Sequence, residues 1–131
     1  MDATNYLRDA IINFWLRNDP DSITAPASVW FGLTTTTAAA DGTGTEPSGA
    51  SYVRVQMSWS DPAGSGDASE NQALAIPFAT GESDTTVVGC GVWDSSTGGN
   101  MLLFDNFTSS FTVTAGNTLS FAAGDVDLQV R

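Results

Sequence analysis

The sequence predicts a mainly β protein, an antiparallel β-sandwich or jelly roll of about eight strands with one N-terminal α-helix. Three observations support this fold class. Helical periodicity is confined to the first 18 residues, two-residue periodicity recurs in short segments from residue 27 onward, and turn-forming residues separate those segments. We therefore expect a single domain over residues 1–131, made of a helix or arm at 1–18 and a β core at 27–131.

The N-terminal segment is the helix candidate. Thr4 or Asn5 is a suitable N-cap. Pro20 disfavours helical backbone at the residue before it, so the helix should end at residues 18–20. The apolar residues of this segment fall on one face at helical spacing: Tyr6, Leu7, Ala10, Ile11, Phe14 and Trp15.

That apolar face could pack against either of two partners, its own domain or a neighbouring subunit. Amphipathic helices usually pack on their own domain, and this is the favoured interpretation. In the other interpretation, the helix reaches a neighbouring subunit. The protein–protein contact residues predicted for that case are Tyr6, Ile11, Phe14, Trp15 and, in the β core, Trp30.

The clearest β element is a hairpin over residues 85–104. In its first strand, Val88, Cys90 and Val92 alternate with the residues between them, which is typical of a strand buried on at least one face. Gly98 and Gly99 suit the positive φ angles of the polar turn that follows. Further strands with a two-residue period are expected at 29–34, 52–59, 73–78, 111–113, 119–121 and 126–130.

The composition excludes several function classes. Fifteen acidic residues against four arginines, with no lysine, give a net charge of −11. Such a surface repels phosphate backbones and anionic lipids, so neither nucleic acid nor a membrane is an expected partner. Without histidine or lysine, the chain has no Ser-His-Asp triad, imidazole metal ligand or Schiff-base residue. We expect no enzymatic activity, no catalytic residue and no cofactor.

Carboxylates are the one catalytic device that this composition leaves open. Asp125 with Asp127, or Asp94 with Asp105, could form a pair of the kind that glycosidases use. Turn formation is the stronger interpretation, because aspartate favours turns and helix caps.

A calcium site is a further alternative. Asp61, Asp67 and Glu70 share one polar loop, and calcium prefers oxygen ligands. Their spacing does not match the EF-hand loop, so no metal site is predicted.

The one cysteine and two of the four tryptophans are expected in the core. Cys90 is the one cysteine and should be a small buried residue, with a disulfide between subunits as the alternative. Trp59 and Trp93 are in register with apolar neighbours and are expected to be buried. Trp30 alternates with Phe31 and is the best candidate for exposure, where it could contact a sugar or another subunit.

Several short motifs occur in order along essentially the whole chain: residues 5–7, 26–34, 44–49 with Tyr52 and Arg54, 75–80, 94–102 and 121–125. With these motifs, the chain resembles small virion proteins of tailed phages that are often labelled tail-fibre proteins. The resemblance implies a β-rich, non-enzymatic structural subunit that assembles in multiple copies. The chain departs from the family pattern at residues 82–84, where relatives commonly have Trp-Gly after the preceding motif.

These observations together favour a virion building block, either a capsid decoration or cement protein or a neck- or tail-associated subunit. Its expected partners are copies of itself, for example in a trimer, and other virion proteins. Strong negative charge suits the exterior of the capsid. A receptor- or carbohydrate-binding module at the tail tip is the main alternative, and a carboxylate hydrolase is the third.

The expected localisation is the virion, after synthesis in the host cytoplasm. The N-terminus lacks the charged and apolar regions of a signal peptide. No apolar run in the chain approaches the length that spans a membrane.

Overall fold

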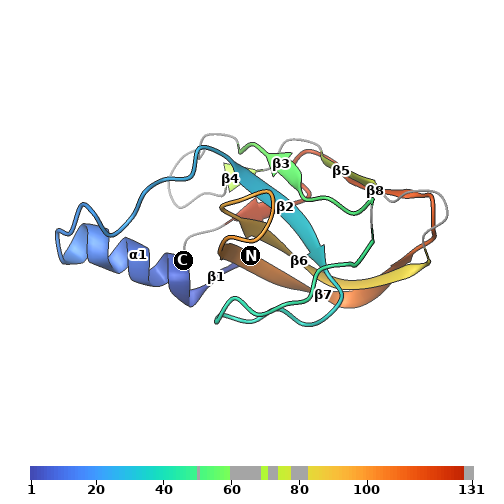
Figure 1. Ribbon diagram of the computed structural model, residues 1–131, viewed down its shortest axis with the longest axis horizontal. Coiled ribbons are helices and arrows are strands. Elements are labelled where there is room, and N and C mark those ends of the chain that lie inside the picture. The colour runs from blue at the N-terminus through green and yellow to red at the C-terminus, as the bar shows by residue number, and fades with distance from the viewer. Residues whose placement is uncertain (50, 60–68, 71–73, 78–82, 129–131) are drawn as a thin grey trace.

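The computed structural model of the chain describes residues 1–49, 51–59, 69–70, 74–77 and 83–128 (Figure 1). Those residues form one helix and nine strands. In chain order the elements are β1 (Asp2–Ala3), α1 (Asn5–Leu16), β2 (Val29–Thr34), β3 (Val55–Met57), β4 (Ser69–Glu70), β5 (Leu74–Pro77), β6 (Thr85–Trp93), β7 (Met101–Val113), β8 (Thr118–Phe121) and β9 (Asp127–Leu128). The predicted mainly β fold class with one N-terminal helix is therefore confirmed.

The strands pair in antiparallel fashion and form one large and two small sheets. The large sheet has the order β1-β7-β6-β2-β3, and the pairs β5–β8 and β4–β9 form two-stranded sheets. Phe31 of β2 and Phe121 of β8 make an edge contact with their ring centroids 5.1 Å apart, so the β5–β8 pair packs on one face of the large sheet. The two sheets therefore share one hydrophobic core.

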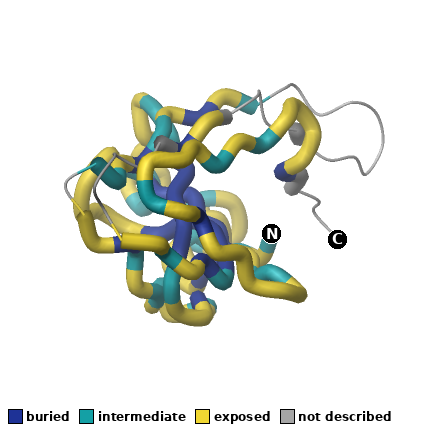
Figure 2. The backbone as a smooth tube through the Cα atoms, turned by 90° about the vertical axis from the view of Figure 1, so that its right-hand side faces the viewer, coloured by how far each residue is buried: buried dark blue, intermediate teal, exposed yellow. Residues whose placement is uncertain are grey.

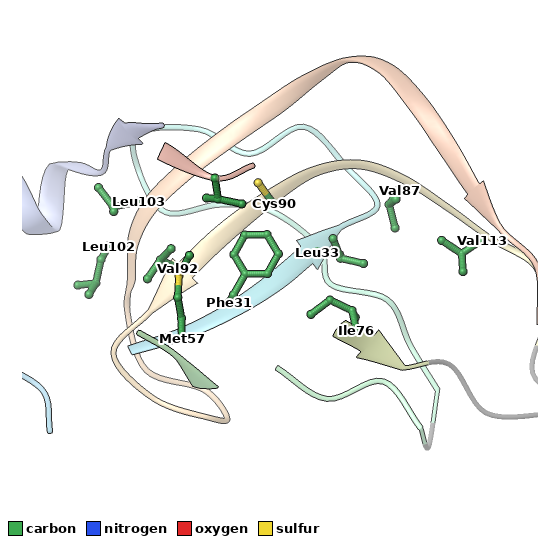
Figure 3. Packing of buried hydrophobic residues seen from close by; sticks show 11 residues of the cluster. Phe31, Leu33, Met57, Ile76, Val87, Cys90, Val92, Leu102, Leu103 and Val113 are labelled. Carbon is green, nitrogen blue, oxygen red and sulfur yellow. The ribbon is translucent and has the colours of Figure 1, made fainter. Parts of the chain in front are cut away.

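The hydrophobic core lies between these two sheets. Phe31, Leu33 and Ile76 are fully buried. Figure 3 shows Phe31 at the centre of the cluster, with Met57 and Val92 on one side and Leu33 and Ile76 on the other. Burial of each such side chain stabilises the fold by about 1.5–3 kcal/mol. Buried residues gather in the middle of the molecule and exposed loops surround them (Figure 2).

The β6–β7 hairpin is present as predicted, but its register changes in the middle. Val87 pairs with Phe111, whereas Gly89 pairs with Asn106. Residues 107–110 of β7 therefore oppose only one residue of β6. This irregularity is a β-bulge, which bends the strands and changes which side chains face the core.

The strict alternation predicted for β6 does not hold at the start of the strand. Val87 belongs to the same buried cluster as Cys90 and Val92, although alternation would place it on the opposite face. The segment 111–113, predicted as a separate strand, is the end of the continuous strand β7.

Helix α1 begins at the edge of the large sheet. The hydroxyl of the fully buried Thr4 donates to the carbonyl oxygen of Met101 at 2.7 Å and accepts from the amide of Leu7 at 3.4 Å. Thr4 is therefore the N-cap, as one of the two predicted choices. After the helix, Asn18 has a left-handed φ of 52°, two residues before Pro20. The last helical residue is Leu16 and the C-cap is Arg17, so the helix ends slightly before the predicted residues 18–20.

Beyond its first turn, α1 extends away from the sheet (Figure 1). Ala10 is the one helix residue that is buried. The favoured interpretation, in which the apolar face packs on its own domain, holds for Leu7, Ala10 and Phe14, which are at least half-buried. It is wrong for Tyr6, Ile11 and Trp15, which are exposed. The reason is the short attachment: β1 pairs with β7 only at Leu103 and Phe104, so the helix is held at its start and passes the end of the sheet.

Candidate functional site

An exposed apolar surface on α1 is the strongest functional feature. Five of the seven large apolar residues that are exposed in the described part of the chain belong to this helix. Ile11, Ile12, Trp15 and Leu16 are 45%, 47%, 73% and 80% exposed. Positions 8, 11, 12 and 15 recur at intervals of three and four residues, so they lie on one side of the helix. We call Arg8 and these four apolar residues the outer face of α1.

The structure places the predicted contact residues in three different settings. Ile11 and Trp15 lie on the outer face, whereas Tyr6 is 52% exposed on another side of the helix. Phe14 is half-buried and makes an edge contact with Trp15, with the ring centroids 5.2 Å apart. Trp30 lies in β2, where it is half-buried and belongs to the sheet instead of the helix. The helix thus gathers a contact surface that does not include every predicted residue.

Ile12 and Leu16 are outer-face residues that the sequence prediction missed. The prediction assumed a single apolar stripe, and neither residue fits that stripe. The signal was nevertheless present, because the apolar pairs at 11–12 and 15–16 are too wide for one stripe. A helix that is apolar on more than one side is normally covered on more than one side.

The charges of the chain are distributed unevenly about this helix. Residues 1–17 contain two acidic residues and two arginines, and residues 18–131 contain 13 acidic residues and two arginines, so the entire net charge of −11 lies outside the first 17 residues. Of the later arginines, Arg54 is buried and ion-paired. The helix is therefore a nearly neutral, apolar arm on a strongly acidic body.

A second feature lies on the face of the large sheet opposite the main core. The guanidinium carbon of Arg54 lies 4.2 Å from the centre of the Trp93 ring. A Cβ atom on Gly32 or Gly91 would come within about 3.0 Å of that ring, so the two glycines leave the space that the indole occupies. Stacking of a guanidinium on an indole is a favourable cation–π interaction.

Arg54 also joins two segments of the chain by hydrogen bonds. Its Nε and Nη2 atoms donate to the two carboxylate oxygens of Glu46 at 2.9 and 2.7 Å. Its Nη1 atom donates to the carbonyl oxygens of Ser95 and Gly98, each at 2.7 Å. The side chain thereby connects the loop before β3 to the turn between β6 and β7.

Tyr52 completes this group, which we call the Arg54 cluster: Glu46, Tyr52, Arg54 and Trp93. The Tyr52 hydroxyl accepts from the amide of Leu33 at 2.8 Å and donates to Glu46 at 2.9 Å. Burial, and then the negative charge of Glu46, raise the pKa of Tyr52 well above its ordinary value. Motifs on which the family resemblance rests, at 44–54 and 94–100, thus meet in one place.

An open pocket of about 240 Å³ lies beside the Arg54 cluster. It is lined by Glu46, Pro47, Tyr52, Val53, Arg54, Ser96, Thr97 and Gly98. The guanidinium and both carboxylate oxygens at its wall already have partners within the protein. The cluster is therefore better suited to holding the fold together than to binding a ligand.

The candidate catalytic carboxylates interact with turn residues or with the N-terminus. Asp94 accepts from the amide and the side chain of Asn100 at 2.8 and 2.9 Å. Asp125 accepts from the amide of Ala122 at 2.6 Å, and Asp105 lies 3.9 Å from the N-terminal amine. The structure does not describe the side chain of Asp127, so the pair that it would form with Asp125 is untested.

The proposed calcium ligands Asp61 and Asp67 lie outside the described residues, and so does the side chain of Glu70. Within the described part of the chain, no group of three or more acidic or cysteine side chains is placed to hold a metal ion.

Cys90 and Asn106 both contribute to the fold. Cys90 is buried, and burial raises the pKa of its thiol to about 12. Asn106 uses its side-chain amide like a strand backbone: it donates to the carbonyl of Ala38 at 2.9 Å and accepts from the Ala38 amide at 2.8 Å. This pair fastens the loop after β2 over the sheet. Trp93 is 4% exposed and Trp59 packs partly buried against the main core, as predicted.

Comparison with known proteins adds one finding on the family. A family model described as podophage GP4 fiber I protein gp80 matches residues 2–129. The matched range includes both α1 and the Arg54 cluster. No curated protein matches the chain. In the part of the chain that the structure describes, no helix has the length and apolar character needed to cross a membrane.

Proposed function

The chain belongs to the podophage GP4 fiber I protein gp80 family, and from this premise we propose that it is a multi-copy structural subunit that assembles through the outer face of α1. Members of this family are fibre proteins of phage particles, so the protein is a virion component of the fibre type. The part that we add is the assembly element and the presence of several copies.

The observation that supports this proposal is the exposure of the outer face. Trp15 and Leu16 are 73% and 80% exposed, although large apolar side chains are stabilised by burial. A 12-residue helix is also marginal in water without packing partners. Both properties are accounted for when another virion subunit covers the helix, since assembly would bury the side chains and stabilise the helix together.

The acidic body supports a position on the outside of the particle. A net charge of −11 keeps a surface soluble and disfavours contact with packaged DNA. Capsid decoration, a neck position and a tail-associated position all satisfy this condition. Because the family is described as a fibre protein, we favour the tail-associated position among these three. The proposed partners are other copies of the chain and neighbouring virion proteins.

A carbohydrate-binding module at the tail tip is less well supported. Sugar platforms need exposed aromatic rings beside polar loops. Trp93 is covered by Arg54, and Trp30 and Trp59 are at least partly buried. Trp15 is the exposed indole among the four tryptophans, and it stands among apolar residues on a helix. We therefore propose a non-enzymatic role in assembly.

Light scattering of the purified protein tests the proposal. Ile12→Glu places a charge on the outer face, and we expect it to lower the mass of the assembled species. Phe111→Glu is the matched control, because Ile12 and Phe111 are 47% and 48% exposed and Phe111 lies at the far end of β7. Equal effects of the two variants, or assembly that is indifferent to Ile12→Glu, would contradict an assembly role for α1.

A further inference from the structure

We propose that the partner of α1 is the α1 helix of a second copy, in an antiparallel two-fold pair in which each Arg8 guanidinium stacks on the Trp15 indole of the other copy. This inference rests on the proposed function, in which α1 is the assembly element. It adds the identity of the partner, the direction of the helices and the register.

The register follows from the order of residues on the outer face. Reversing the helix about the midpoint between Ile11 and Ile12 exchanges these two residues. The same reversal exchanges Arg8 and Trp15, because both lie equally far from the midpoint. All four residues lie on one side of the helix. These four residues of the outer face are therefore complementary to themselves under a two-fold axis, which is the requirement for an isologous dimer contact.

The chemistry of the exchanged residues suits direct contact. Trp15 is 73% exposed, and its edge contact with Phe14 leaves a large part of the indole uncovered. Arg8 is exposed, and it makes no ion pair with the residues that the structure describes. The same combination already occurs within the subunit, where Arg54 lies 4.2 Å from the ring centre of Trp93. Ile11 and Ile12 would pack between the two stacked pairs.

The charge of the body favours the antiparallel direction. Each α1 is joined to its acidic body at its N-terminal end, through Thr4 and β7. Parallel helices would bring two or three such bodies together at the same end, where they repel. Antiparallel helices place the bodies at opposite ends. They also bring Arg17, at the far end of one helix, toward the acidic body of the other copy.

The size of the contact predicts a weak dimer in solution. The outer face of one short helix is on the order of a few hundred Å², within the range of the largest patch that monomers expose. Stable complexes bury about 800 Å² on each partner. We therefore expect a dimer that dissociates on dilution, and we expect Arg8→Glu to weaken it at least ~10-fold.

Disulfide trapping between two variants tests the register. Arg8→Cys and Trp15→Cys are purified separately, mixed and oxidised. In a mixed dimer, the two cysteines face each other at one site, while the native Arg8 and Trp15 remain paired at the other site. The native Cys90 does not compete, because it is buried and its thiol resists ionisation.

The expected result is a cross-linked dimer that forms in the mixture and forms poorly in either variant alone. A cross-link of Arg8→Cys with itself would overturn the proposal, because it indicates parallel helices, as in a trimer. Absence of the mixed cross-link would overturn it as well.

Failure of this inference and failure of the proposed function are distinguishable. If the mixed cross-link is absent but Ile12→Glu still lowers the assembled mass, α1 is an assembly element with another partner. If Ile12→Glu also has no effect, the assembly role of α1 is wrong.

Discussion

Arg54 and Trp93 form a stacked pair, with the guanidinium carbon 4.2 Å from the ring centre. The pair closes one face of the large sheet, and Glu46 holds the guanidinium in place through two hydrogen bonds. Ser95 and Gly98 accept the remaining hydrogen bonds, so a single side chain fixes the β6–β7 turn against the loop before β3.

Replacement of Arg54 by alanine is expected to lower the free energy of unfolding by about 2–4 kcal/mol. Loss of one partner of a largely buried ion pair costs about 3–5 kcal/mol, and the partial exposure of Glu46 reduces that cost. Lysine at this position should recover only part of the loss, because it cannot form the two-pronged contact with a carboxylate. Denaturant unfolding measures the difference.

Arg17→Ala is the control for this experiment. Arg17 is exposed, and its hydrogen bond to Asn13 lies on the surface of α1. Its replacement should change the unfolding free energy by less than about 0.5 kcal/mol. Similar losses for the two arginines would show that the Arg54 cluster does not stabilise the fold.

Thr4→Ala is expected to loosen the N-terminal arm. The substitution removes the N-cap of α1 and the hydrogen bond to Met101, which together should cost about 1–3 kcal/mol. Relative to the native protein, hydrogen exchange in this variant should become faster in α1 and change less in β6. Thr4→Ser keeps the hydroxyl and should retain most of the protection. If the serine variant loses as much protection as the alanine variant, the hydroxyl is not the anchor.

Asn106→Asp is expected to destabilise the protein by about 1–3 kcal/mol, because a carboxylate cannot donate to the carbonyl of Ala38. Protonation restores a donor, so the deficit relative to the native protein should shrink as the pH falls toward about 4, the ordinary pKa of aspartate, and should be smallest below it. Asn117→Asp changes an exposed turn residue in the same way and should have little effect. A deficit that is independent of pH would argue against the hydrogen bond to Ala38.

Cys90 makes the stability of the protein depend on alkaline pH. Burial, and then the charge of Asp105, raise the pKa of its thiol from 9.0 to about 12. Between these values the unfolded chain loses the proton and the folded chain keeps it, so rising pH favours unfolding. The contribution is complete below about pH 9 and falls by up to about 1.4 kcal/mol for each pH unit above it.

Unfolding curves at pH 8.5 and pH 10.5 measure this effect. Cys90→Ala lowers stability at both values because it leaves a small cavity, but its stability should fall less between them than that of the native protein. An equal fall in both proteins would mean that other groups, such as Tyr52, account for the alkaline dependence.

The strands and the helix cap were determined locally and could be predicted from the sequence. A two-residue period, turn glycines such as Gly98 and a threonine before an apolar helix act within a few residues of one another. The burial of Trp93 and Cys90 followed from the same pattern. These features depend on residues that are close together along the chain, so they can be predicted from the sequence.

The Arg54 cluster and the β-bulge were decided by tertiary structure. Glu46, Arg54 and Trp93 are separated along the chain, and nothing local indicates that β2 and β6 will bring them together. The bulge depends on how Val87 and Gly89 pair across the hairpin, and each strand by itself is consistent with regular alternation.

The destination of the helix was likewise decided by tertiary structure. An apolar face has the same residue pattern whether its own domain or another subunit covers it. The sequence determined that α1 would form and which residues would be apolar. Only the attachment of β1 to the edge of β7 directed the helix past the sheet and left Trp15 and Leu16 exposed, because a side chain is buried by what lies opposite it in space.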